Sequence, residues 1–353
     1  MTDQPPQHPV QSYDAWAGQH PQQPASPGAR AFPHPEPTPY HAMLRTWSYA
    51  TWKPFVGIVI VVGAFFVLAA FVFLLVTAIA AAFESGNWFD NVMRSGTLKD
   101  VGPVELLGLN LGIASLSLVT WFIIRVVHGM RPRWLMSVVP GIRWRLLGVC
   151  AGWAVVAVIA QVVVGALLPG SPDGASGSVN EMTKTLVLSG VVVFLTTPLQ
   201  AIGEEYVFRG YLMQAVGSLF RNKWVAMVVT ALIFALAHGA QNFPLFFDRF
   251  GFGLVAAWLV TVTGGLEAGI ALHIVNNFFA LGIGLLFGDI TQVLGDTDAS
   301  WWNILLTLTQ SGVYGGLVYY SARKMDLQTL TRPPTRAPSE APTGTVGGDL
   351  ATA

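Results

Sequence analysis

FVGIVIVVGAFFVLAAFVFLLVTAIA, residues 55–80, is an apolar run without a single charged side chain. About 20 such residues are enough for a helix to cross the hydrocarbon core of a bilayer, and backbone amides in lipid must be hydrogen-bonded within their own segment. The run therefore predicts a transmembrane helix. Seven further apolar segments follow, at residues 104–124, 146–168, 186–206, 224–240, 243–262, 266–287 and 301–320. The sequence thus predicts an all-α fold, a polytopic membrane helix bundle of about eight transmembrane spans.

The composition supports a membrane protein. Of 353 residues, 53% are hydrophobic and only 11% are charged, whereas soluble domains are about 25% charged. Lys plus Arg and Asp plus Glu each number 19, so the chain lacks the excess of basic residues that is typical of nucleic-acid-binding proteins. We expect the lipid bilayer as the surrounding partner and no nucleic-acid partner. Cys150 is the only cysteine, which excludes an internal disulfide and a Cys-based zinc site.

Both ends of the chain differ from the middle. Residues 1–45 are rich in Pro and Gln and poor in aliphatic side chains, and residues 326–353 have a similar polar composition. Such segments bury too little apolar surface to offset their conformational entropy. We therefore expect a disordered N-terminal tail at 1–45, a transmembrane domain at 46–325 with its motif core at 186–287, and a disordered C-terminal tail at 326–353.

Basic residues gather at alternate ends of the expected spans, at Arg45 and Lys53, at residues 125–145, at residues 209–223 and at residues 323–324. Loops rich in Lys and Arg face the cytoplasm. With eight spans, all four clusters fall on one side. The prediction is a multi-pass protein of the cell membrane with both termini cytoplasmic.

The stretch GEEYVFRGYL, residues 203–212, brings charge to the end of an apolar run. Charged groups within a membrane are costly and persist when they are paired, hydrated or functional. Glu205 and Arg209 are at i and i+4 and share a helix face, whereas Glu204 is rotated by about 100°. Two adjacent carboxylates in a poorly solvated place cannot both ionise at little cost. We expect Glu205 and Arg209 as a fixed pair and Glu204 as a general base.

Two other spans carry polar residues at helical spacing: FALAHG, residues 234–239, with His238, and ALHIVNN, residues 271–277, with His273 and Asn277 at i and i+4. Each motif alone is also typical of packing or of hydrogen bonds between membrane helices. Together with Glu204, they predict a shared hydrated cavity with the groups needed to activate water. Asp248 and Arg249 are expected in an exposed turn between two spans, and His128 is expected as a solvated residue of a basic loop.

These motifs resemble the CPBP family of intramembrane glutamic proteases, which includes the CAAX prenyl protease Rce1 and bacterial Abi-type proteins. The family pattern Glu-Glu-x-x-x-Arg, Phe-x-x-x-His and His-x-x-x-Asn is matched in order, at Glu204, Glu205 and Arg209, at Phe234 and His238, and at His273 and Asn277. The Thr263-Gly-Gly stretch also resembles the family's lead-in to its last motif. The resemblance covers about residues 186–287, and we favour the Abi-type branch.

The resemblance implies a metal-independent endopeptidase acting on a peptide or membrane-protein substrate. It implies that Glu204 with His238 activates a water, that His273 with Asn277 stabilises the oxyanion, and that Glu205 and Arg209 support the base. No metal or other cofactor is expected. Glu267 stands where the family usually has an aromatic residue, a difference that we expect to affect substrate preference more than the catalytic set.

Two alternatives stay open at this level. A zinc-dependent membrane metalloprotease would use Glu204, His238 and His273 as ligands, since two His and one Glu form a known catalytic zinc set; the usual HExxH helix is absent from the sequence. A non-catalytic transporter or scaffold would use the same polar residues to line a pathway or hold an assembly.

Overall fold

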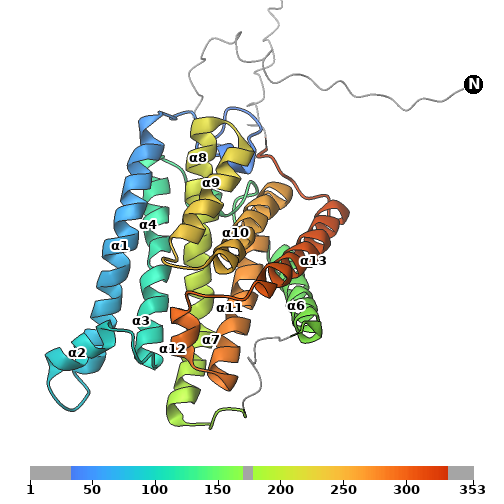
Figure 1. Ribbon diagram of the computed structural model, residues 1–353. Coiled ribbons are helices and arrows are strands. Elements are labelled where there is room, and N and C mark those ends of the chain that lie inside the picture. The colour runs from blue at the N-terminus through green and yellow to red at the C-terminus, as the bar shows by residue number, and fades with distance from the viewer. Residues whose placement is uncertain (1–32, 170–177, 333–353) are drawn as a thin grey trace, which may run out of the picture. The chain divides into compact units, whose positions relative to one another are not determined.

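The structure is a computed structural model that describes residues 33–169 and 178–332. Within these residues the chain is helical, with isolated bridges as its only β-type pairing. The helices of the first half are η3 (Tyr40–Ala42), α1 (Trp52–Ala81), α2 (Trp88–Gly96), α3 (Pro103–Ala114), α4 (Leu116–Phe122), η4 (Ile123–Val127), α5 (Arg133–Met136) and α6 (Trp144–Leu167). Those of the second half are α7 (Lys184–Glu205), η5 (Tyr206–Leu212), α8 (Met213–Phe220), α9 (Lys223–Leu236), α10 (Phe243–Thr263), α11 (Glu267–Phe287), α12 (Ile290–Gly295) and α13 (Trp302–Lys324). The predicted all-α fold is confirmed (Figure 1).

Every predicted apolar segment is largely helical, although the segment 224–240 extends past the end of α9, and the chain is a multi-pass membrane protein. Six helical stretches of the described residues are long and apolar enough to cross a bilayer: Trp52–Ala81, Pro103–Val127, Trp144–Leu167, Lys184–Phe220, Phe243–Thr263 and Glu267–Phe287. α9 has a similar character but only 14 residues, and α13 is less apolar than the others. The count of eight spans therefore stays a prediction.

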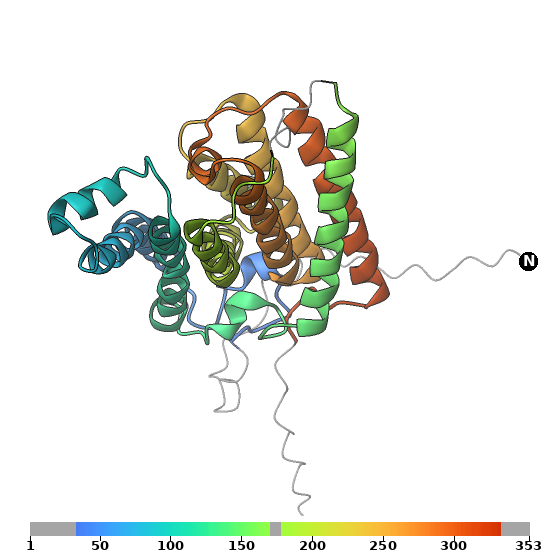
Figure 2. The ribbon, with the colours of Figure 1, turned by 90° about the horizontal axis from the view of Figure 1, so that it is seen from below.

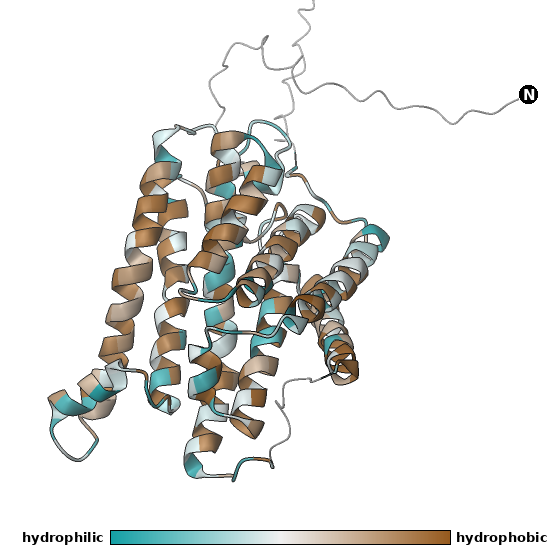
Figure 3. Cartoon of the chain, in the orientation of Figure 1, coloured by the Kyte–Doolittle hydropathy of each residue, from teal (hydrophilic) through white to brown (hydrophobic). Residues whose placement is uncertain are grey.

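α7 is the central helix of the bundle. It packs against α3 on one side and α11 on the other, while α1 packs outside α3, and α6 and α13 pack outside α11 and α10. The view along the bundle shows this succession (Figure 2). The outer helix α1 is apolar along its length, whereas α7 and α11 are interrupted by hydrophilic stretches (Figure 3). Polar side chains are therefore concentrated where the helices meet.

The fourth predicted span is longer than its apolar run. The sequence places its end near residue 206, but α7, η5 and α8 form one continuous helical stretch, Lys184–Phe220. η5 is a π-helix, a form that is rare in proteins overall but is often found at functional sites. It directly follows the two glutamates. The continuation past Arg209 places these charged residues inside the bundle.

The segments assigned by composition to the two tails are partly ordered. Tyr40, Met43 and Leu44 are buried, and the Tyr40 hydroxyl donates a hydrogen bond to the Leu135 carbonyl. The backbone amide of Thr331 donates to the Thr38 carbonyl, so residues 33–45 and 326–332 pack together on the bundle. The remaining residues of the two expected tails, 1–32 and 333–353, lie outside the described residues.

Candidate functional site

A cavity of about 490 Å³ lies between the helices that carry the three motifs. Its lining includes Glu204 from α7, His238 from the turn after α9, and His273 and Asn277 from α11. The predicted convergence of these four side chains on one cavity is therefore present in the structure. The further polar residues of the lining are Asn110, Gln200, Asp248, Arg249, Asn276, Thr291 and Gln310.

The two adjacent glutamates have different surroundings. Glu205 is fully buried, and its Oε1 accepts a hydrogen bond from Nη1 of Arg209 at 2.8 Å. The guanidinium is 1% exposed and lies 4.0 Å from the centre of the Phe234 ring, an arrangement that adds a cation–π attraction. Glu204 instead lines the cavity. The predicted separation of a fixed ion pair from a second carboxylate is observed.

His273 lies between the two carboxylates. Its Nδ1 is 2.9 Å from Oε1 of Glu205, and its Nε2 is 3.4 Å from Oε2 of Glu204. The first contact fixes the orientation of the ring, because Glu205 is itself held by Arg209. The Nε2 edge is therefore the part of the ring that remains for contacts in the cavity.

Gln200 connects the motifs and was missed from the sequence. Its Nε2 donates to Oε1 of Glu204 at 2.7 Å, and its Oε1 accepts from Nδ2 of Asn277 at 3.0 Å. Hydrogen bonds thus run from Asn277 through Gln200 to Glu204. The available signal was spacing, because a polar residue four positions before Glu204 shares its helix face.

His238 has a separate support. Its Nδ1 is 2.8 Å from the Phe234 carbonyl oxygen, which indicates that Nδ1 carries the proton and Nε2 can accept a hydrogen bond. Its ring packs edge to face on Phe234. No ion pair within 4.0 Å joins His238 to Glu204 in the described part of the chain, although both line the cavity. The Glu204 carboxylate is nearer to His273.

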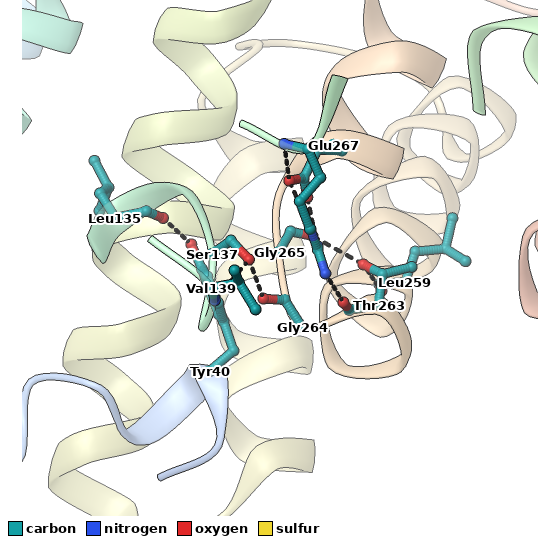
Figure 4. Close-up of polar contacts among 10 residues, drawn as sticks. Tyr40, Leu135, Ser137, Val139, Leu259, Thr263, Gly264, Gly265 and Glu267 are labelled. Atoms are coloured by element: carbon teal, nitrogen blue, oxygen red, sulfur yellow. Dashed lines mark hydrogen bonds and ion pairs between the residues drawn. The ribbon is translucent and has the colours of Figure 1, made fainter. Parts of the chain in front are cut away.

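The structure contradicts one expectation for this region and places Glu267 outside the cavity lining. Asp248 and Arg249 do not form an exposed turn: they lie within α10 and line the cavity. Glu267, expected to influence substrate preference, is absent from the cavity lining. It is fully buried and binds Nε and Nη2 of Arg143 at 2.9 and 2.6 Å (Figure 4). This bidentate pair joins the start of α6 to the start of α11, so Glu267 has a structural explanation.

The zinc metalloprotease alternative requires three ligand side chains that converge on one metal ion. Among residues 33–169 and 178–332, no group of three or more His, Cys, Asp or Glu side chains is arranged to hold a metal ion. The described residues therefore do not fit the zinc set of Glu204, His238 and His273.

The helices and the cavity define a class of protein: a multi-pass membrane protein with a carboxylate–histidine site in a cavity between its helices. Residues 185–279 match the family model of the Rce1-like proteins, described as "Type II CAAX prenyl endopeptidase Rce1-like". The relationship to the CPBP and Rce1 family that the motifs indicated is thus confirmed over this segment. The match contains every motif residue from Glu204 to Asn277.

A curated relative is also similar to the chain. It is the uncharacterized protein YyaK of Bacillus subtilis (strain 168), 24% identical over 164 residues. The alignment covers 43% of this chain and 54% of YyaK, so the chain spans about half the length of this relative. No solved structure matches the chain.

Proposed function

We propose that this chain is an intramembrane endopeptidase that uses a glutamate to activate water. The observation that carries the proposal is the placement of Glu204 and His273, from two different helices, 3.4 Å apart on the wall of one cavity. An Rce1-like match over the same residues supports a peptide bond as the target. The substrate is then a peptide or a segment of a membrane protein.

Glu204 is the proposed general base. Gln200 holds its Oε1, which leaves Oε2 directed to the His273 side of the cavity. The attacking water is placed between Glu204 and His238, whose Nε2 is available as an acceptor because Nδ1 is bound to the Phe234 carbonyl. Glu204 takes a proton from this water while the water oxygen attacks the peptide carbonyl carbon. The same proton then passes from Glu204 to the leaving amine nitrogen as the C–N bond breaks.

His273 and Asn277 are the proposed oxyanion donors. Glu205 and Arg209 hold the His273 ring from its Nδ1 side, so the imidazolium form would donate from Nε2 toward the developing negative charge. Preorganised donors of this kind contribute strongly to catalysis. Asn277 donates to Gln200 in the structure, and its amide would exchange this acceptor for the substrate oxygen.

The test is cleavage of a panel of quenched fluorescent peptides by the purified protein in detergent, with wild type compared to Glu204→Gln. We expect the variant to lose at least about a hundredfold in kcat/KM, the usual contribution of a general base, while it keeps its melting temperature. Glu84→Gln is the matched control, because Glu84 is exposed and lies outside the cavity lining. Full activity of Glu204→Gln would refute the proposed mechanism.

The same assay separates the alternatives. Exhaustive chelation should leave cleavage intact, and a loss that Zn²⁺ restores would establish a metalloprotease instead. A transporter or scaffold would tolerate Glu204→Gln and His238→Ala in its biological assay, whereas the proposed enzyme should lose its function with either substitution.

A further inference from the structure

Arg249 is a cation in the cavity that the catalytic proposal does not use. It lies in α10, six residues after the start of the helix, and it lines the same cavity as Glu204 and His238. The guanidinium is also close enough to His238 to act on it electrostatically. The family motifs do not include this position.

The protein satisfies only a small part of the hydrogen-bonding capacity of Arg249. Its Nη1 donates to Oε1 of Gln241 at 2.7 Å, and this neutral amide is its hydrogen-bond partner in the described structure. Ion pairs within 4.0 Å hold Arg94, Arg143 and Arg209, but no such pair of the described residues involves Arg249. A guanidinium has five N–H donors and stays charged.

The acidic groups near Arg249 do not replace an ion-pair partner. Asp248 and Asp296 act on its charge, but the Asp248 carboxylate accepts a hydrogen bond from the Thr307 hydroxyl, and neither carboxylate of these described residues lies within 4.0 Å of the guanidinium. An ionised group within a membrane-spanning helix is costly unless it is paired or functional. The planar guanidinium of Arg249 can donate two parallel hydrogen bonds to the two oxygens of a carboxylate.

A peptide substrate supplies such a carboxylate, so the role of Arg249 rests on the proposed peptidase function. We propose that Arg249 binds a carboxylate of the peptide substrate and selects peptides that carry one close to the scissile bond. A cavity of 490 Å³ is about 10 Å across, the length of about three extended residues. The carboxylate therefore belongs to the C-terminus of a short leaving peptide or to an Asp or Glu side chain within about three residues of the cleaved bond.

A matched set of quenched peptides tests the proposal and separates the two sources. Starting from a peptide that the enzyme cleaves, one pair differs in a free C-terminal carboxylate against a C-terminal amide. A second pair, amidated at the C-terminus, differs in Glu against Gln near the scissile bond. We expect wild type to favour the carboxylate member of one pair by about tenfold or more in kcat/KM, the size of a charge-assisted hydrogen bond. Arg249→Gln should cleave both members of that pair about equally.

The controls exclude a merely structural role. The readout for every variant is the ratio of kcat/KM between the two members of a pair: Arg249→Lys should keep part of the preference, and Arg94→Gln should keep all of it, because Arg94 is 62% exposed in a surface ion pair. Absence of a carboxylate preference in wild type, or an unchanged preference in Arg249→Gln, would overturn the proposal. Should Arg249→Gln fail to fold, the wild-type preference and Arg249→Lys still decide.

Binding distinguishes failure of this inference from failure of the proposed function. Fluorescence anisotropy with the same peptides in a Glu204→Gln background measures affinity without turnover. A carboxylate preference that disappears in the Glu204→Gln, Arg249→Gln double variant supports the Arg249 site even if the wild-type protein cleaves no peptide. Cleavage without any preference would retain the peptidase and reject the role of Arg249.

Discussion

Gly269 lies one helical turn before His273 and faces the Glu205 carboxylate. A Cβ atom at this position would lie 2.5 Å from Oε2 of Glu205, closer than a Cβ atom normally approaches an unbonded oxygen. Gly269→Ala should therefore displace Glu205 and, with it, the support of His273. Because small misplacements of catalytic groups are costly, we expect kcat on the peptide panel to fall at least about tenfold.

Gly282 provides the matched control for this prediction. It lies on the same helix, α11, and a Cβ atom there would meet no atom within 4 Å. Gly282→Ala should leave kcat unchanged, with a small gain in stability from the better helix propensity of alanine. Equal kcat values for Gly269→Ala and wild type would show that the position of Glu205 does not control the site.

His128 is buried, which contradicts the solvated position expected from the sequence. Because of this burial, we expect the stability of the protein to decrease in acid. His128 is 2% exposed, its Nε2 is 3.2 Å from the Tyr211 hydroxyl, and its Nδ1 has no hydrogen-bond partner among the described residues. Burial, with a contribution from the nearby charge of Lys53, lowers the pKa of His128 from 6.5 to about 4. The unfolded chain therefore binds a proton more readily between these two pH values, and folding stability must fall as the pH decreases from about 6.5 toward 4.

The lost free energy of unfolding has an upper limit of about 3 kcal/mol, from a pKa difference of about 2.5 units at about 1.36 kcal/mol each. Thermal unfolding in detergent at pH 7 and pH 5 measures the part lost over this interval, about 2 kcal/mol. We expect the melting temperature of wild type to fall over this interval by more than that of His128→Gln, which cannot titrate. Parallel decreases in the two proteins would assign the acid sensitivity to other groups.

Local spacing predicted the pair of Glu205 and Arg209, since an i, i+4 relation needs no tertiary information. It could not place Asp248, Arg249 or His128, because a polar residue at the edge of an apolar run can face water, a neighbouring helix or a cavity. Only the packing of α10 against α9 and α13 decides this for Arg249. Likewise, Glu267 is explained by Arg143, which lies 124 positions away in sequence.

At the scale of elements, the contact between α3 and α7 positions the proposed catalytic glutamate. Gly203 immediately precedes Glu204, and a Cβ atom at Gly203 would lie 2.6 Å from the Ile113 carbonyl oxygen. Small residues allow membrane helices to approach closely in this way. Gly203→Ala should separate the two helices, destabilise the protein by about 1 to 3 kcal/mol through overpacking and lower peptide cleavage. Thermal unfolding in detergent and the peptide panel measure the two effects.

Gly190 is the control for this contact. It also lies on α7, but a Cβ atom there would meet no atom within 4 Å, so Gly190→Ala should keep the melting temperature and the activity. A Gly203→Ala protein as stable and active as Gly190→Ala would show that the close approach of α3 and α7 is not required.

The existence of the helices was predictable from apolar runs, but the continuation of the helical stretch beyond α7 was not. Hydropathy ends the apolar run where charged residues begin, near Glu204, because it ignores pairing. In the structure Arg209 is neutralised by Glu205 and packs on Phe234 and Phe252. The helix therefore continues through η5 and α8, which carries the Glu204 carboxylate into the bundle and away from its end.

At the scale of the whole molecule, the two ends of the described chain meet. Pro39 and Leu330 form an antiparallel bridge, and the Thr38 amide donates to the Thr331 hydroxyl at 2.9 Å. Segments that pair in this way lie on the same side of the membrane, so the chain between them crosses the bilayer an even number of times. The distribution of Lys and Arg predicts that this side is the cytoplasm.

Single-cysteine labelling tests both statements. Cys150 is the only cysteine and is buried, so Cys150→Ser provides a background for Glu36→Cys, Gln328→Cys and Ser85→Cys, all at exposed positions. A membrane-impermeant maleimide applied to intact spheroplasts should label Ser85→Cys alone, because the α1–α2 turn lies at one end of α1 and the segment that precedes α1 lies at the other end (Figure 1). All three should react after lysis. Labelling of Glu36→Cys and Gln328→Cys instead of Ser85→Cys would invert the orientation, whereas different results for Glu36→Cys and Gln328→Cys would contradict the even number of crossings and the pairing of the two ends.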